Sequence, residues 1–475
     1  MDVSPAWNWY YARGIFQRII HLITDTPMTA LERRTVTALS GLYSFRMLGL
    51  FMVLPLLSLY ASDMPGGTAL MLGLALGAYG LAQALLQIPL GLLSDRIGRL
   101  PVIIGGLLVF ALGSLVAAQA ETVQGIVLGR FLQGAGAIAS TVMALVADLT
   151  SDSQRTKAMA VVGMSIGASF AVALVIGPVL AASGGLSLVF YVTAALALLG
   201  IFIVVFAVPR VSQVRRLQGE VGTVPGLIRR SLLDGALMRL NIGVFALHFI
   251  LMAVFVALPL VLERDLGIDR SAHWQVYLPT LALSIAGMVP LMILAERTGR
   301  LKLAFFLAIA GICAAQWPIS GPWGDWGLYL GLWLFFAGFN YLEASLPSLV
   351  SKTVYAGGKG TALGVYSSFQ FLGAFAGGAC GGLAMQYGGS GAVFACCAVV
   401  ALAWAALTAG MHTPRDLTNH VVRLPREEAH RQRHLAVLQS AAGVEDLLLL
   451  EEEYTLYLKV DDSTFDPGLL DDIQA

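Results

Sequence analysis

The stretch GLLSDRIGRLP, residues 91–101, interrupts a long apolar region with a short charged turn. Asp95, Arg96 and Arg99 stand close together there, with more than fifteen mostly apolar residues on either side. The pattern returns 201 residues later in LAERTGRLK, residues 294–302. A charged turn that recurs between apolar segments predicts a membrane protein built from two related halves.

Composition supports a membrane protein. Of the 475 residues, 57% are hydrophobic and 12% are charged, whereas a soluble domain carries about 25% charged residues. A helix needs about 20 apolar residues to cross the hydrocarbon layer. Twelve segments qualify: 36–60, 70–93, 101–119, 123–148, 157–182, 186–208, 240–262, 274–295, 302–320, 326–351, 360–386 and 390–411. The sequence therefore predicts an all-α membrane protein with twelve transmembrane helices.

The repeat and the polar breaks predict the domain organisation. The expected parts are a cytoplasmic N-terminal segment (1–35), a six-helix bundle (36–208), a cytoplasmic linker (209–239), a second six-helix bundle (240–414) and a soluble C-terminal domain (415–475). An even number of spans gives both halves the same orientation. Parallel halves with a binding site between them near the midplane are a known plan of transporters.

The distribution of positive charge predicts the orientation. Alternate polar segments carry nineteen Lys and Arg residues on one face, and the other face carries only Arg264 and Arg270. Positive residues accumulate on the cytoplasmic side. Both termini are therefore expected in the cytoplasm, and the polar segments between spans one and two and between spans seven and eight are expected at the outer face.

Several motifs resemble a known family. The charged turn is similar to the signature between spans two and three of the major facilitator superfamily, and LGRFLQGAGA (128–137) is similar to its second signature. The stretches RMLGLFMVLP (46–55), FNYLEASLPSL (339–349) and KGTALGVYSSFQFLGAFAGG (359–378) resemble a group within it that is placed among drug:proton antiporters. That group carries a small cytoplasmic domain after span twelve.

The resemblance implies the twelve-helix fold, a place in the bacterial inner (plasma) membrane, and export of amphipathic small molecules against proton entry. The proton gradient takes the place of a cofactor, since the chain contains no nucleotide-binding P-loop. No enzymatic nucleophile–base set is found. Two alternatives stay open: an importer of a small polar or anionic solute, and a membrane sensor that signals through its C-terminal domain.

The charged turn predicts a conformational latch. Asp95 and Arg99 are four residues apart and face each other if the turn is helical, and Asp148 ends span four at the same face. The resemblance implies that Asp95 meets the start of span eleven near 359–362, with Arg99 linking it to Asp148 while the outside is open. The alternative is a topology signal. The expected latch residues are Gly91, Asp95, Arg96, Gly98, Arg99 and Asp148.

Charged or titratable residues inside spans are costly and point to function. Glu343 is the carboxylate deepest within a span, and burial of such a group favours proton binding and release near neutral pH. His248 also titrates near neutrality. The candidates for proton coupling are Glu343, Arg130, His248 and Arg46. Each has a structural alternative, and Arg46 could either bind an anionic group or pair with Glu343.

Uncharged polar residues recur at helical spacing within the spans. Such stripes face a cavity or a partner helix rather than lipid, and the alternative to a cavity is hydrogen bonding between helices. The candidates for a substrate cavity are Tyr79, Gln83, Gln87, Gln133, Asn340, Tyr366 and Gln370. The four cysteines form no ligand set with histidine, so no metal site is expected.

The C-terminal segment differs in charge and pattern. Residues 415–475 carry a net charge of −7, against +7 for residues 1–414. Their βαββα pattern resembles a ferredoxin-like module with its last strand short or missing. The negative charge argues against nucleic acid as a partner and favours docking on the linker arginines. The expected partners are membrane lipid, protons and an unidentified small molecule, and the chain is expected to be a monomer.

Overall fold

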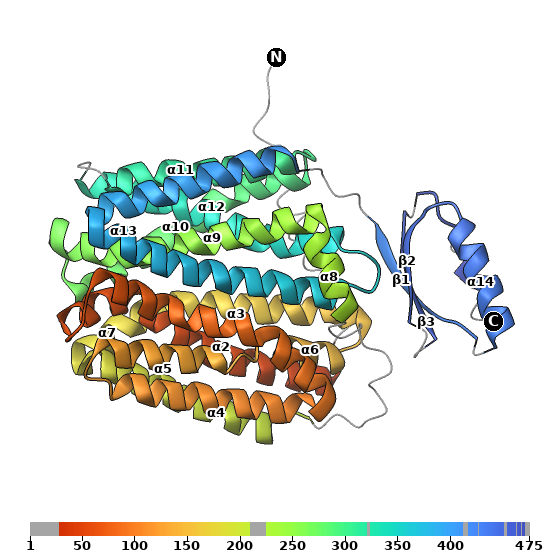
Figure 1. Ribbon diagram of the computed structural model, residues 1–475, viewed down its shortest axis with the longest axis horizontal. Helices are drawn as coiled ribbons and strands as arrows, with labels where there is room; N and C mark the ends of the chain where they lie inside the picture. The colour runs from red at the N-terminus through yellow and green to blue at the C-terminus, as the bar shows by residue number, and fades with distance from the viewer. Residues whose placement is uncertain are drawn as a thin grey trace, which may run out of the picture.

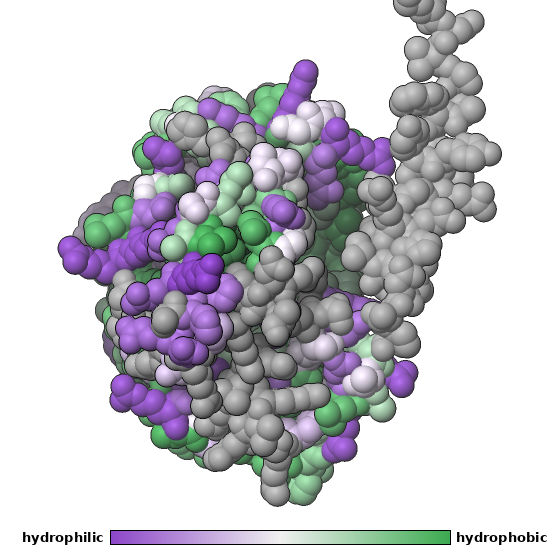
Figure 2. Space-filling model, turned by 90° about the vertical axis from the view of Figure 1, so that its right-hand side faces the viewer, coloured by the Kyte–Doolittle hydropathy of each residue, from purple (hydrophilic) through white to green (hydrophobic). Residues whose placement is uncertain are grey.

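The computed structural model describes residues 28–209, 225–320, 324–411, 417–425, 427–450, 454–461, 463–466 and 468–470. Long helices lie side by side in one bundle, and a small module with three strands sits at one end (Figure 1). The predicted N-terminal segment and linker lie partly outside the described residues. Figure 2 shows the end that carries the module, where hydrophilic side chains gather.

The N-terminal half is helical throughout most of its described length. It contains α2 (Ala30–Tyr60), η1 (Ala61–Asp63), α3 (Ala69–Ile97), α4 (Arg99–Ala118), α5 (Val123–Ala135), α6 (Ala139–Asp148) and α7 (Asp152–Phe206). The backbone of α7 is non-helical at Gly184 and Gly185, which divides it into two helices. The predicted fourth span is likewise broken between α5 and α6, at residues 136–138.

The C-terminal half follows the same plan. It contains α8 (Pro225–Leu233), α9 (Gly235–Leu260), η3 (Val261–Asp265), η4 (Arg270–Ala272), α10 (Trp274–Glu296), α11 (Leu301–Ser320), α12 (Gly324–Thr353) and α13 (Lys359–Ala409). Here α13 is divided at Gly389. Within the described part of the chain, nine helices are long and apolar enough to cross a membrane, with α7 and α13 each counted once.

The sequence repeat is also a repeat of backbone conformation. Gly98 and Gly299, which occupy matching places in the two charged turns, have φ of 101° and 66°. Gly185 and Gly389, which divide α7 and α13, both have φ of 67°. Glycine adopts such angles without the clash that a Cβ would cause. The same residue type therefore makes the same turns in both halves.

The C-terminal module contains β1 (Thr418–Arg423), α14 (Glu428–Ser440), β2 (Val444–Leu450) and β3 (Thr455–Val460). The strands form an antiparallel sheet in the order β1-β3-β2. Side chains alternate between the two faces of a strand, yet every residue of β3 is buried. Leu456, Leu458 and Val460 pack in the core of the module, so the opposite face must be covered by something else.

The membrane-spanning part covers that second face. Asp446 accepts a hydrogen bond from the Ala356 backbone N–H (2.9 Å) and lies 3.4 Å from Arg230 of α8. The buried Lys459 ammonium donates to the carbonyls of Lys352 (2.5 Å) and Val354 (2.7 Å) at the end of α12. Burial lowers the pKa of Lys459, and Asp446 partly offsets this effect. The module is thus docked on the turn between α12 and α13, and one of its contacts is with a linker arginine.

Replacement of Lys459 tests this docking. Lys459→Met removes two charge-assisted hydrogen bonds, each of which contributes about 1.5–3 kcal/mol. We expect amide hydrogen exchange in residues 352–358 to accelerate by roughly tenfold or more, with strand β1 still protected. Arg433→Met, on the exposed side of α14, is the matched control. Equal exchange of 352–358 in the two variants would contradict the docking.

Candidate transport site and gates

The charged turn forms a compact ion-pair cluster. Asp95 pairs with Arg99 one helical turn later, and Arg99 also reaches Asp148 through Nε (3.1 Å). The Arg99 guanidinium donates a further bond to Ser94 Oγ (2.7 Å). Gly98 ends α3, and Arg99 begins α4. Arg99 therefore ties the ends of α3, α4 and α6 together.

The other latch residues lie around this cluster. A Cβ at Gly91 would lie 3.3 Å from Ser140 Oγ of α6, so glycine permits the close approach of α3 to α6. Arg96 is exposed. The contacts that the structure shows for Asp95 and Arg99 belong to the N-terminal half. The implied contact of Asp95 with the start of α13 remains a prediction for another conformation.

Two arginines are enclosed in the N-terminal half with neutral partners. Arg46 Nη2 donates to Tyr79 Oη (2.9 Å), Gln83 Oε1 (3.0 Å) and the Gly136 carbonyl (3.1 Å). Because α5 ends just before Gly136, this guanidinium satisfies a carbonyl freed by the helix break. In this conformation Arg46 pairs within its own half and not with Glu343. Its Nε and Nη1 have no hydrogen-bond partner among the described residues, and binding of an anionic group stays a prediction.

Arg130 forms the second part of this network. It donates to Gln133 Oε1 (2.9 Å) and the Ala75 carbonyl (3.3 Å), and its guanidinium lies 5.2 Å from the centre of the Tyr79 ring. The network extends further because Gln133 Nε2 donates a hydrogen bond to Ser114 Oγ (2.8 Å) and Gln83 Nε2 donates one to Gln87 Oε1 (2.7 Å). The side chains are at most 3% exposed. Four candidates for the cavity, Tyr79, Gln83, Gln87 and Gln133, are thus buried and hydrogen-bonded within one half in this conformation, and the Tyr79 ring also packs against Phe371 of α13 (6.1 Å between ring centres).

Three helices of the C-terminal half meet at Glu343. The carboxylate is on α12, 3.3 Å from Gln370 Nε2 of α13 and 3.7 Å from His248 Nε2 of α9. Gln370 Nε2 also lies 2.8 Å from His248 Nε2. Since both neighbouring helices supply partners, Glu343 faces the interior of the bundle rather than lipid. Its side chain is nevertheless 39% exposed, although Oε2 is buried and has no hydrogen-bond partner among the described residues.

The hydrogen bonds define the state of the histidine. His248 Nδ1 lies 3.2 Å from the Val244 carbonyl, which can only accept, so Nδ1 carries the proton. Nε2 then accepts the amide N–H of Gln370, and the ring is neutral in this arrangement. A proton arriving at Nε2 would compete with Gln370 and attract the Glu343 carboxylate. The site can therefore exchange one hydrogen-bond pattern for another when a proton arrives.

Two further predicted residues lie on the same helices. Asn340, one turn before Glu343, donates to Ser284 Oγ of α10 (2.9 Å). Tyr366, one turn before Gln370, is buried, and its hydroxyl has no hydrogen-bond partner among the described residues. A buried hydroxyl without a partner is uncommon and calls for an explanation such as a bound ligand or proton path. The sequence thus identified Glu343, His248 and Gln370 without indicating that they meet. Asn340 and Tyr366 lie one turn away on the same helices.

The two halves contact each other closely at the predicted outer end. A Cβ at Gly73 of α3 would lie 2.1 Å from the carbonyl of Gly378 of α13, and one at Gly382 would lie 2.7 Å from the carbonyl of Ala69. Ser58 of α2 donates to the Phe255 carbonyl of α9 (3.1 Å). The halves are therefore closed against each other at this end. Sequence analysis missed these glycines, although small residues spaced by four are a signal of close helix packing.

Comparison with known proteins identifies the family. A family model described as Major Facilitator Superfamily matches residues 39–378 and 240–449. The chain belongs to this superfamily. It is 43% identical over 443 residues to the inner membrane transport protein YajR of Escherichia coli K12, which covers 92% of this chain and 96% of that protein. Multidrug resistance protein MdtH of Aeromonas hydrophila is 29% identical over 364 residues, covering 73% and 84%.

Solved structures of transporters share the fold. A mutant of the nucleoside transporter NupG matches with a TM-score of 0.63 and 14% identity, over 80% of this chain and 100% of that one. A bacterial homologue of the lysosomal transporter Spinster, in an inward-facing and unoccupied conformation, matches with a TM-score of 0.59 and 15% identity, over 81% and 95%. The chain is thus a multi-pass membrane transporter of the superfamily.

Addition of one methyl group between α3 and α13 tests the closed outer end. A Cβ at Gly378 would lie 2.5 Å from the Gly73 carbonyl, closer than packed atoms approach. We expect Gly378→Ala to lengthen the distance between spin labels at Ser183→Cys and Tyr387→Cys, in a background without the native cysteines. Gly364→Ala, on the same helix α13, is the control, because a Cβ at this position would have no atom within 4 Å. Identical distance distributions for the two variants would show that this packing does not hold the outer end closed.

Proposed function

We propose that this transporter is a proton-coupled antiporter that exports amphipathic small molecules by alternating access. The proposal includes twelve spans in two parallel halves, a ferredoxin-like C-terminal domain, and cytoplasmic termini in the bacterial inner membrane. Division of α7 and α13 at their glycines, together with the 30-residue α12, supports the span count. The name of the related MdtH protein supports the direction of transport.

The observation that carries the proposal is the carboxylate of Glu343, which is held between His248 and Gln370 at the junction of α9, α12 and α13 with one buried oxygen that lacks a hydrogen-bond partner among the described residues. A charged side chain at the centre of a span raises the free energy of membrane insertion by about 2.5–3.5 kcal/mol. A charge kept at this cost points to a functional role. A carboxylate can bind a proton when its site faces the outside, and lose it when the site faces the cytoplasm. Binding of substrate and binding of the proton then compete for one site, which couples their movements.

The surroundings of Glu343 fit an amphipathic substrate. Polar groups come from Asn340, Gln370 and Tyr366, which offer donors and acceptors at one end of the site. Aromatic rings pack beside these groups: the Phe339 ring lies 5.9 Å from the His248 ring and 6.0 Å from that of the fully buried Phe335. A mostly apolar wall with a few convergent polar groups is typical of small-molecule sites.

The enclosed network of the N-terminal half has a supporting role in this mechanism. Arg46 holds the break between α5 and α6, and Arg130 joins that region to α3 through the Ala75 carbonyl. Any change in the break alters the position of α6, whose end carries Asp148 of the ion-pair cluster. We therefore assign Arg46 and Arg130 to transmission between the centre of the bundle and the latch.

The latch has the opposite role to the outer contacts. In the structure the halves are in contact at the predicted outer face, and the printed contacts of Asp95 and Arg99 lie within the N-terminal half. In the alternate conformation, Asp95 would approach the start of α13 and close the cytoplasmic side. Exchange between these two closures would carry the Glu343 site from one side of the membrane to the other.

Removal of the Glu343 charge tests the function directly. In proteoliposomes with an imposed pH gradient, a panel of amphipathic compounds should release protons through the wild-type protein. We expect Glu343→Gln to lower this compound-dependent proton flux at least tenfold while the protein remains folded, because the amide cannot bind and release a proton. Glu296→Gln, an exposed carboxylate in the second charged turn, should retain the flux. Measurable compound binding without any proton flux in the wild type would contradict antiport.

A further inference from the structure

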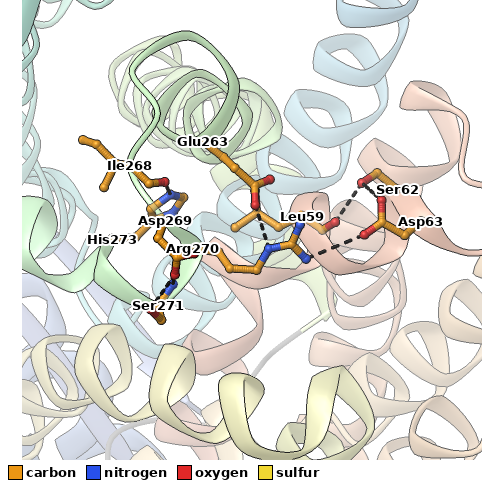
Figure 3. Close-up of polar contacts among 9 residues, drawn as sticks. All are labelled: Leu59, Ser62, Asp63, Glu263, Ile268, Asp269, Arg270, Ser271 and His273. Atoms are coloured by element: carbon orange, nitrogen blue, oxygen red, sulfur yellow. Dashed lines mark hydrogen bonds and ion pairs between the residues drawn. The ribbon is translucent and has the colours of Figure 1, made fainter.

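A second ion-pair cluster lies at the predicted outer face, at the opposite end of the bundle from the charged turn. Arg270 begins η4, Glu263 lies in η3 after α9, and Asp63 ends η1 after α2. Figure 3 shows the Arg270 side chain reaching between the two carboxylates. Arg270 and Glu263 belong to the C-terminal half, and Asp63 belongs to the N-terminal half. The cluster therefore crosses the boundary between the halves.

Arg270 makes contacts both within its own half and across the boundary. Its Nε donates to Glu263 Oε1 at 2.7 Å, and its Nη1 lies 3.6 Å from Asp63 Oδ2. Its guanidinium also lies 4.9 Å from the centre of the Tyr60 ring of α2. The contact with Glu263 stays within one half, and those with Asp63 and Tyr60 must break when the outer ends separate.

Local structure holds Arg270 in this position. Asp269 precedes it and accepts a hydrogen bond from the Ser271 backbone N–H (2.8 Å), which caps the short helix. The buried His273 ring contacts the Ile268 carbonyl through Nε2 (3.1 Å). Glu263 lies in a π-helical turn, a feature common at functional sites. The helix η4 also packs against α7 of the N-terminal half.

The charge distribution makes this arrangement unusual. Only Arg264 and Arg270 carry positive charge on the predicted outer face. Arg264 is exposed, whereas Arg270 is partly buried among acidic and aromatic partners from both halves. A cation placed between the halves on a face with so few cations indicates a specific use.

We propose that Arg270 is the gate residue of the outer face: it stabilises the outward-closed conformation by binding Asp63 and Tyr60 across the two halves, and Glu263 positions it. The inference deepens the alternating-access mechanism and rests on it. Opening to the outside breaks the contacts with α2 and keeps the contact with Glu263. Arg270 then remains in place, ready to close the gate again.

Spin-label distances test the gate without any substrate. In the background that carries labels at positions 183 and 387, Arg270→Gln should raise the ratio of open to closed outer ends by about three- to thirtyfold, the range for one exposed ion pair plus one cation–π contact. Asp63→Asn should shift the ratio in the same direction. Arg264→Gln, the other cation of this face, should leave it unchanged.

The double variant distinguishes a direct contact from two separate effects. If Asp63 and Arg270 act through each other, the double variant should open the gate no more than Arg270→Gln alone. Additive shifts, or a shift with Arg264→Gln equal to that with Arg270→Gln, would overturn the proposal. If Arg270→Gln fails to fold, Asp63→Asn decides alone, since that side chain is 68% exposed. Because no transport is measured, failure of the gate is distinguishable from failure of proton coupling at Glu343.

Discussion

The backbone contact between α3 and α13 is the constraint on which the arrangement of the halves depends. Gly73 and Gly378 leave no room for a Cβ, so the two helices touch along their main chains at the predicted outer end. Lipid tails are as apolar as the helices, and association in a bilayer therefore relies on such close packing and on polar contacts. At the other end of α3, the charged turn contacts only residues of the N-terminal half in the interactions that the structure shows.

Buried charge is distributed unequally between the halves. The N-terminal half encloses Arg46 and Arg130 among amide, hydroxyl and carbonyl groups, whereas the C-terminal half presents Glu343 with a neutral histidine. Neutral partners satisfy hydrogen bonds but do not cancel charge. Both guanidinium groups also keep buried nitrogens without a hydrogen-bond partner among the described residues, Nε and Nη1 of Arg46 and Nη2 of Arg130. The Glu343 side chain is 39% exposed and shares Gln370 Nε2 with His248, an arrangement that suits proton exchange.

The sequence predicted local features well because they depend on neighbouring residues. The charged turn, its repeat 201 residues later and the strands of the module follow from spacing alone. Each of Glu343, His248 and Gln370 was identified as a polar residue in an apolar span. Their meeting could not be predicted, because it depends on how α9, α12 and α13 pack. Spacing likewise placed Tyr79 and Gln83 on one face of a helix. It could not show that Arg46, from another helix, donates hydrogen bonds to both.

The outer gate escaped prediction because its residues are ordinary loop charges until the fold brings them together. Its contacts are also individually weak, since Asp63 is largely exposed and an exposed ion pair contributes about 0.2–1 kcal/mol. Weak contacts suit a gate, because a transporter must pass between two conformations of similar free energy, each closed on one side. A ligand shifts the equilibrium between them only by the difference in its affinity for the two conformations. A strong buried pair between the halves would stop the cycle in one conformation. Glycine packing between α3 and α13 sets where the halves meet, and small charged contacts at each end then decide which side is closed.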